Sequence, residues 1–179
     1  IMGYSCTYAP VELIYASGYH PARIIGLANN VSLSDVYLQS YACAVVRTLL
    51  EDSLLKKLDF LSAFLFLHTC DSMQRLSRRQ RQMCIRDRIL PVKFSSQTSK
   101  DYFLDILNDF KSKLEQDQNI KIGIDSLNKA IQTYNDLKAN LLKLYNIKSN
   151  NPEALSYSDL SKIVRASFIM DPLEFINIS

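Results

Sequence analysis

The stretch Gly3-Tyr-Ser-Cys-Thr-Tyr-Ala-Pro-Val-Glu-Leu-Ile-Tyr-Ala-Ser-Gly-Tyr-His-Pro-Ala-Arg23 is the most informative part of this 179-residue chain. It predicts a short polar loop that carries Cys6 and closes at Pro10. A helix over Val11 to Ser17 should follow, because Pro is typical of a helix start and Gly18 of the position just past a helix end. The thiol would then lie beside the positive end of a helix, where a thiolate or an anionic cofactor is stabilised. The pattern therefore favours a functional site over ordinary core packing.

Three short apolar runs predict buried parallel strands: Arg23 to Leu27, Phe60 to Leu67 and Leu90 to Phe94. Helical patterns separate these runs, as β-α-β units require. We therefore expect an α/β fold with a partial parallel-sheet lobe of the Rossmann or flavodoxin-like type. The second run leads into His68-Thr-Cys-Asp71, and in open α/β sheets the carboxyl ends of strands carry the ligands.

The segment between the first two strands predicts one long helix, Val36 to Leu58, and Ser34 or Asp35 could cap its early turn. Three amphipathic helices are predicted in the second half of the chain, with apolar stripes that most simply form core: Ser99 to Leu114, Asp125 to Leu144 and Ser158 to Met170. The second stripe comprises Leu127, Ile131, Tyr134, Leu137, Leu141 and Leu144. We expect an α/β lobe over residues 1–97 and a helical segment over 98–179.

Composition is that of an ordinary globular chain, with 47% hydrophobic and 22% charged residues. The apolar run that ends at Leu67 is too short to cross a bilayer, which needs about 20 residues, so no membrane association is expected. No secretory signal is visible at the start. Four cysteines without such a signal favour the reducing cytoplasm.

The segment 78–88 differs from its surroundings. It holds five Arg and one Asp, a net charge of +4, whereas the whole chain is only +3. It has no interleaved aromatic residues, so nucleic acid is not an expected partner. Its sequence resembles translated sequencing-adapter read-through, and our hypothesis is that residues 77–88 are not native.

Three cysteines are candidates for a shared metal site: Cys6, Cys43 and Cys70, separated by 37 and 27 residues. Each is predicted beside a helix start or a strand end, and all three could converge on one edge of the sheet. Buried structural thiols are the simpler alternative, and the only one that we favour for Cys84. A zinc module is disfavoured because no closely spaced ligand pair exists.

Several motifs resemble the 2-hydroxyacyl-CoA dehydratase family, which includes the benzoyl-CoA reductase subunits. They are Cys6-Thr-Tyr-Ala-Pro-Val-Glu-Leu-Ile14, Ala16-Ser-Gly-Tyr-His-Pro-Ala-Arg23, Ser40-Tyr-Ala-Cys-Ala-Val-Val-Arg47, Leu67-His-Thr-Cys-Asp-Ser72 and Leu90-Pro-Val-Lys-Phe94. The resemblance implies an oxygen-sensitive iron–sulfur subunit. We expect this chain to be a fragment of such a subunit, without its second α/β domain.

The same resemblance implies a [4Fe–4S] cluster held by Cys6 and Cys43, with Cys70 a conditional third ligand. The implied reaction removes water from (R)-2-hydroxyacyl-CoA through a ketyl radical. The implied partners are a second dehydratase subunit, an ATP-dependent activator that injects one electron, and the acyl-CoA substrate. Ring reduction of the benzoyl-CoA type and a non-catalytic electron-relay role are the alternatives.

Three further residues are candidates for catalysis. Ser5 flanks Cys6 and could bind substrate or sulfur, although Ser residues also cap helices. Glu12 could act as a base, but a carboxylate is also favoured in the first turn of any helix. Arg47 lies one turn after Cys43 and could either approach the cluster or form a structural ion pair.

Overall fold

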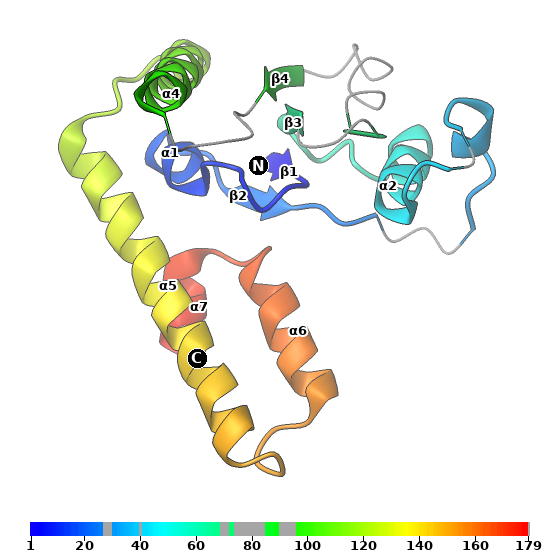
Figure 1. The fold of residues 1–179 in the computed structure, drawn as a ribbon, viewed down its shortest axis with the longest axis vertical. Helices are drawn as coiled ribbons and strands as arrows, with labels where there is room; N and C mark the ends of the chain where they lie inside the picture. Colours follow the sequence, from blue (N-terminus) through cyan, green and yellow to red (C-terminus); the bar gives the residue numbers. More distant parts are fainter. Residues whose placement is uncertain (27–29, 40, 69–71, 74–84, 90–95, 179) are drawn as a thin grey trace.

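The computed structural model describes residues 1–26, 30–39, 41–68, 72–73, 85–89 and 96–178, with the backbone alone for 68 and 85–89. Four parallel strands form one sheet: β1 (Met2–Tyr4), β2 (Pro21–Arg23), β3 (Ala63–His68) and β4 (Ile85–Ile89). Their order is β2-β1-β3-β4 (Figure 1). The expected partial α/β lobe with a parallel sheet is therefore confirmed.

Helices cover both faces of this sheet, and β3 shows why. Its alternate residues Ala63, Leu65 and Leu67 are buried in a cluster with α1 (Val11–Ala16) and α4 (Gln97–Gln118). Phe64 and Phe66 point the other way, into a cluster with α2 (Ala44–Leu54). A strand buried on both faces needs a continuous apolar run, which is the pattern of this segment.

Helix α1 agrees with the predicted bounds to within one residue. Pro10 is the N-cap of this helix, one position before the first helical position at which Pro is typical. Its carbonyl accepts the backbone N–H groups of Leu13 and Ile14. Gly18 follows the helix with a φ of +82°, a conformation that L side chains rarely adopt. The Pro before this helix and the Gly after it therefore marked the ends of a six-residue helix correctly to within one residue.

The helix predicted over Val36 to Leu58 is wrong in its length. A 3₁₀ turn, η1 (Ser34–Val36), is followed by non-helical residues, and α2 begins only after Cys43. The extended backbone of Cys43, with φ −62° and ψ 151°, makes it the N-cap. The predicted cap at Ser34 or Asp35 is also wrong, because neither lies at the N-cap of η1 or makes a capping hydrogen bond there.

The second half of the chain is helical as predicted: α4, α5 (Ile124–Asn150), α6 (Tyr157–Ser167) and a further short helix, α7 (Pro172–Ile178). Helix α5 packs against α1 and α7 and extends away from the sheet (Figure 1). One member of its predicted stripe is wrong, because Ile131 is 40% exposed whereas Ala130 and Thr133 are buried. The stripe follows the 3.6-residue period and so shifts by one residue at this turn.

The sheet differs from the predicted strands at three places. Strand β1 was not predicted, and the strand predicted from Arg23 instead ends at Arg23 as β2. The predicted strand Leu90–Phe94 lies outside the described residues. Strand β4 lies in the segment adjoining it and pairs with β3 from Phe64↔Ile85 to His68↔Ile89. The hypothesis that 77–88 is not native stays a prediction, as do the domain bounds.

No helix in the described part of the chain is long and apolar enough to span a membrane.

Candidate functional site

Cys6 lies on the loop that joins β1 to α1, at the carboxyl end of β1. Its side chain is half-buried and packs against the cluster between the sheet, α1 and α4. Its carbonyl accepts the N–H of Ala9 at 3.2 Å, which closes the loop before the helix begins. The loop therefore holds the thiol at the edge of the sheet with one side against the core and one side open.

The residues on either side of Cys6 tie this loop to the two neighbouring strands. The Ser5 hydroxyl donates to the sulfur of Met73, just beyond β3, at 3.6 Å. Arg23, the last residue of β2, donates from Nη2 to Thr7 Oγ1 at 3.2 Å. The carboxyl ends of β1, β2 and β3 are thus connected around Cys6, which is where an open α/β sheet places its ligands.

Cys43 is the N-cap of α2 and is exposed. Its carbonyl accepts the N–H groups of Val46 and Arg47, each at 3.1 Å, but its side chain makes no capping hydrogen bond. Helix α2 follows β2 and precedes β3, and these two strands run parallel in the same sheet on either side of β1, so the amino end of α2 lies on the side of the carboxyl ends of the strands. The fold therefore brings Cys6 and Cys43 to the same edge of the sheet, with the Cys43 thiol unused by the helix.

The third cysteine, Cys70, lies outside the described residues, as do Asp71 and Cys84. Among the residues that the structure describes, no three His, Cys, Asp or Glu side chains gather closely enough to hold a metal ion. The described donor set at the candidate site is thus two thiols, one half-buried and one exposed.

The other two candidate side chains both form ion pairs. Arg47 donates from Nε and Nη2 to a single oxygen of Asp35, at 2.9 and 2.6 Å. Glu12 accepts from Lys138 Nζ at 3.2 Å, which links α1 to α5. An ion pair was the alternative expected for Arg47, whereas for Glu12 the alternative was a carboxylate favoured in the first turn of a helix, and its Lys138 partner was not predicted. The catalytic roles of both residues stay predictions.

Glu51 is a buried carboxylate that was not predicted from the sequence. It is 3% exposed and lies two turns after Cys43 on α2. Backbone N–H groups donate to it, above all that of Ser34, and these bonds hold the pKa of the carboxyl below its usual value. The one sequence signal was a pair of acidic residues, Glu51 and Asp52, directly after the apolar Leu49 and Leu50.

Two buried phenols also lie near the sheet. Burial raises the pKa of Tyr4 to about 12, although the Arg23 cation opposes this shift. Burial likewise raises the pKa of Tyr134, and the nearby Tyr4 and Glu12 add to the effect. Both phenols therefore stay neutral at physiological pH, which suits core positions rather than proton transfer.

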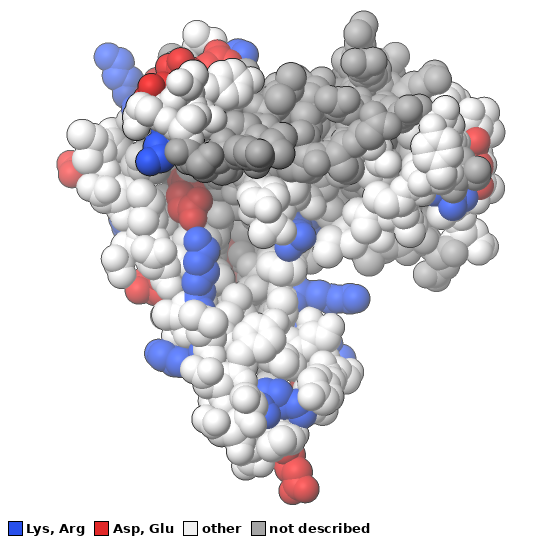
Figure 2. All heavy atoms as spheres, in the orientation of Figure 1, with Lys and Arg blue, Asp and Glu red and all other residues white. Residues whose placement is uncertain are grey.

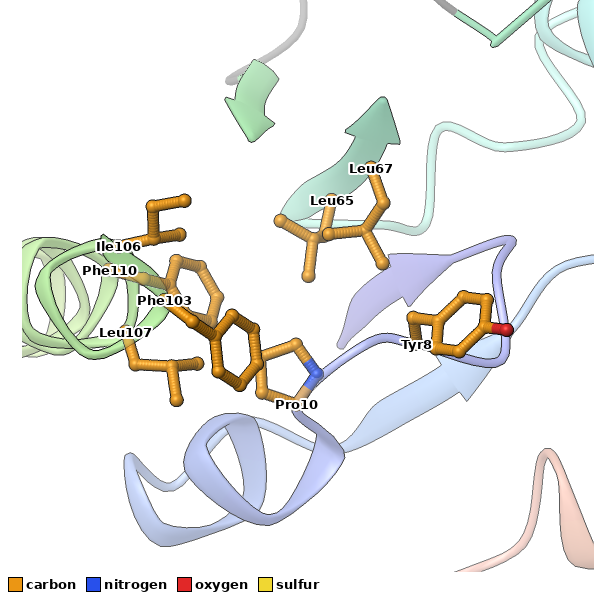
Figure 3. Close-up of a pocket in the computed structure, with 8 residues that line it drawn as sticks. All are labelled: Tyr8, Pro10, Leu65, Leu67, Phe103, Ile106, Leu107 and Phe110. Atoms are coloured by element: carbon orange, nitrogen blue, oxygen red, sulfur yellow. The ribbon is translucent and has the colours of Figure 1, made fainter. Parts of the chain in front are cut away.

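A small apolar pocket lies between the Cys6 loop and α4 (Figure 3). Tyr8 and Pro10 line it from the loop, Leu65 and Leu67 from β3, and the α4 side chains Phe103, Ile106, Leu107 and Phe110 close the other side. The lining is apolar apart from the Tyr8 hydroxyl. This pocket therefore offers the Cys6 loop an apolar support.

A larger cleft of about 420 Å³ lies elsewhere, along β2 between the ends of α2 and α6. Its apolar lining includes Ile24, Ile25, Leu58, Phe60, Phe168 and Ile169. The molecule is hollowed on this side, where the α/β lobe meets the helices (Figure 2). None of the described candidate residues lines it, so size alone does not mark the candidate site.

Comparison with known proteins shows the family of the chain. The family described as 2-hydroxyglutaryl-CoA dehydratase, D-component, matches residues 6–179. A benzoyl-CoA reductase subunit of Thauera aromatica is 28% identical over 180 residues, covering 97% of this chain and 46% of that protein. The (R)-phenyllactyl-CoA dehydratase beta subunit of Clostridium sporogenes is 24% identical over 171 residues, covering 93% of this chain and 46% of that protein.

The (R)-2-hydroxyglutaryl-CoA dehydratase beta subunit of Acidaminococcus fermentans is 25% identical over 171 residues, covering 91% of this chain and 45% of that protein. The chain thus spans about half the length of the curated relatives that it matches. Because the family match covers nearly the whole chain and begins at the first candidate thiol, the chain belongs to the 2-hydroxyglutaryl-CoA dehydratase D-component family.

Proposed function

We propose that this chain is the cluster-binding part of a 2-hydroxyacyl-CoA dehydratase subunit, which eliminates water from (R)-2-hydroxyacyl-CoA. The observation that carries the proposal is the placement of two thiols, Cys6 and Cys43, at the carboxyl edge of one parallel sheet. The family match and the dehydratase names of the relatives support it. Like those beta subunits, the chain would work with a second subunit, and its cysteine usage fits the cytoplasm.

The described residues fit an iron–sulfur cluster in their donor chemistry. Thiolates are the usual ligands of such clusters, and neither thiol is taken up by another described hydrogen bond or a disulfide. Cys6 and Cys43 would hold a [4Fe–4S] cluster, with Cys70 as a conditional third ligand. When bound, the cluster would supply a Lewis-acidic iron and a one-electron carrier. Cys6 is half-buried against the core, and Cys43 is exposed.

The proposed reaction overcomes a specific chemical difficulty, because the β-proton that must leave a 2-hydroxyacyl thioester is barely acidic. One electron, delivered by a separate ATP-dependent activator, would convert the thioester carbonyl into a ketyl radical anion. That species expels hydroxide, the β-proton then becomes acidic enough to leave, and the electron is finally given up again. Ser5 would bind the substrate or a sulfur atom, Arg47 would approach the cluster, and Glu12 is the candidate base.

A second activity has a specific observation in its favour. The benzoyl-CoA reductase subunit matches with 28% identity over 97% of this chain, against 24% and 25% for two of the dehydratase subunits. We therefore keep reduction of an aromatic acyl-CoA as the alternative activity. Both activities would use the same thiols, so the substrate decides between them.

The experiment measures iron and acid-labile sulfide in anaerobically purified protein, co-expressed with its partner subunit. Cys6→Ser and Cys43→Ser should each lower the bound iron at least several-fold, whereas Cys84→Ser should leave it unchanged. Zinc in place of iron, or equal iron in all variants, would contradict the proposal. Turnover of (R)-2-hydroxyacyl-CoA against benzoyl-CoA, with the activator and ATP present, then separates the two activities.

A further inference from the structure

The cleft along β2 has the size and the apolar surface of a small-molecule site. Its volume of about 420 Å³ falls in the range of ligand pockets, about 300–1,000 Å³. Three of its large apolar side chains are exposed, Ile25 to 41%, Phe60 to 56% and Ile169 to 58%. Apolar side chains that are gathered in one concave place, rather than scattered singly, indicate a binding surface.

Two hydrogen bonds between β2 and the end of α6 hold the sides of this cleft together. The backbone N–H of Arg23 donates to the carbonyl of Phe168 at 2.9 Å. The next carbonyl, that of Ile169, accepts from Nε2 of His20 at 2.6 Å. Because β2 is the edge strand of the sheet, these bonds also cover part of its open edge. The cleft is therefore a built feature of the fold, and it needs no ligand to form.

The charge of the described lining is predominantly positive. One acidic residue, Asp52, lines the cleft together with four basic ones: His20, Arg23, Lys57 and Arg165. The Asp52 carboxylate is already used, because its Oδ1 lies 3.1 Å from Lys57 Nζ and only 6% of its side chain is exposed. Figure 2 shows basic side chains on this hollowed side of the molecule. The cleft therefore combines an apolar surface with an excess of cations.

Arg23 has hydrogen-bond donors that no described group accepts. A guanidinium carries five N–H donors, and Arg23 uses one of them, from Nη2 to Thr7 Oγ1 at 3.2 Å. Its Nε is buried without a hydrogen-bond partner among the described residues, and its Cζ lies 4.8 Å from the centre of the Phe168 ring. The described residues give this guanidinium no carboxylate partner either. A carboxylate, whose two oxygens match the planar guanidinium, would supply both acceptors and counter-charge.

We propose that this cleft binds a small amphiphilic carboxylate, with Arg23 and Arg165 at its carboxylate and the apolar lining around its chain or ring. Arg165 lies in the last turn of α6, three residues before Phe168, and its exposed guanidinium has no partner among the described residues. Burial of the apolar chain supplies affinity, and the two cations select a negative head group. The proposal goes beyond the proposed function, because none of the described candidate residues lines the cleft.

The test compares the binding of octanoate and of 1-octanol to the full chain by isothermal titration calorimetry at pH 7. The two probes have the same chain length and differ in the charge of the head group. Octanoate should bind about 10-fold more tightly than octanol. Arg23→Gln and Arg165→Gln should each weaken octanoate binding by about 5- to 10-fold and leave octanol binding unchanged. Phe60→Ser, at an exposed position that is not needed for folding, should weaken the binding of both probes.

Lys162→Gln is the matched control, because it removes a cation from the same helix that pairs with Asp159 and does not line the cleft. It should leave octanoate binding unchanged. Equal affinities for the two probes, or an octanoate affinity that Arg165→Gln does not change, would overturn the proposal. Absence of octanoate binding would also overturn it, including absence caused by a second copy of the chain on the cleft, which sedimentation at the same concentration identifies.

Hydrogen exchange locates the bound probe and provides a second test if Arg23→Gln does not fold. Saturating octanoate should slow the exchange of the Ile25 amide, at the wall of the cleft, several-fold, while the amide of Leu137 in α5 keeps its rate. Slowing at Tyr8 instead would place the probe in the small pocket beside the Cys6 loop and would overturn the proposal. Neither measurement requires bound iron, so a failure here is distinguishable from a failure of the proposed function.

Discussion

Glu12 Oε1 and Lys138 Nζ lie 3.2 Å apart and join α1, next to the Cys6 loop, to the middle of α5. The pair bridges segments that are 126 residues apart in the chain. It is partly open to solvent, with 27% of the Glu12 side chain and 58% of the Lys138 side chain exposed. Glu12 therefore has a structural partner in the position where a catalytic base was predicted.

This pair allows the two roles of Glu12 to be separated. Lys138→Gln should lower the free energy of unfolding by no more than about 1 kcal/mol, because exposed ion pairs contribute little. If Glu12 acts only as a structural partner, Glu12→Gln should have an effect of the same size and leave turnover of the assembled enzyme intact. Urea unfolding and turnover of both variants check this. Loss of turnover in Glu12→Gln but not in Lys138→Gln would instead support the catalytic role.

The contact between α4 and the sheet should dominate the stability of the α/β lobe. Phe110 is 1% exposed and lies in the cluster that also contains Leu65 and Leu67. Phe110→Ala should therefore cost about 3–5 kcal/mol, because a large buried side chain leaves a cavity. Leu104→Ala on the same helix, where the side chain is 55% exposed, should change stability by less than about 0.5 kcal/mol. Similar values for both in urea unfolding would contradict this packing of α4.

Close approach of the chain after β2 to helix α2 predicts a strict requirement for Gly26. A Cβ at this position would clash with the backbone between Thr48 and Leu49, which cannot move without displacing α2. Gly26→Ala should therefore cost about 1–3 kcal/mol by overpacking. The control is Gly123→Ala, where a Cβ meets nothing within 4 Å and the cost should not exceed about 1 kcal/mol. Equal thermal shifts in the two variants would show that the approach is not tight.

The parts of the fold that could be predicted are those whose residues repeat a period over a long segment. Helices α4, α5 and α6 meet this condition, whereas strand β3 was found as a continuous apolar run. Strand β1 has three residues, too few to show alternation, and its position follows only from pairing with β2 and β3. The helix predicted over Val36 to Leu58 began too early, because the extended backbone at Cys43 interrupts an apolar spacing that otherwise continues.

In the candidate site, too, some residues could be predicted from local sequence and others could not, because their contacts depend on the tertiary fold. Cys6 and Cys43 could be placed beside helix starts from local sequence alone, and Arg47 could be assigned an ion pair as an alternative. The buried position of Glu51 could not be predicted, because most of its partners are backbone N–H groups, which every residue type except proline carries. The Glu12–Lys138 contact was equally hidden, since it depends on how α5 packs against α1.

The Glu51 carboxylate should make the stability of the protein depend on pH in acid. Hydrogen bonds, first that of the Ser34 N–H, hold its pKa in the folded state below the usual 4.5. The contribution to stability is thus fully present above 4.5, and it is lost as the pH falls from there through the lowered folded-state value. In that window the unfolded chain binds a proton that the folded chain does not.

Urea unfolding at a series of pH values between about 6 and 3 measures this dependence. The free energy of unfolding of Glu51→Gln should fall less steeply with decreasing pH than that of the unmodified chain. Asp159 contributes with the same sign, because the Ser156 hydroxyl and Lys162 lower its pKa from 3.8, so Asp159→Asn should remove a separate and more acidic part of the slope. A Glu51→Gln curve parallel to that of the unmodified chain would mean that the carboxylate does not carry its charge into the folded state, and that the 32–34 loop is held by other contacts.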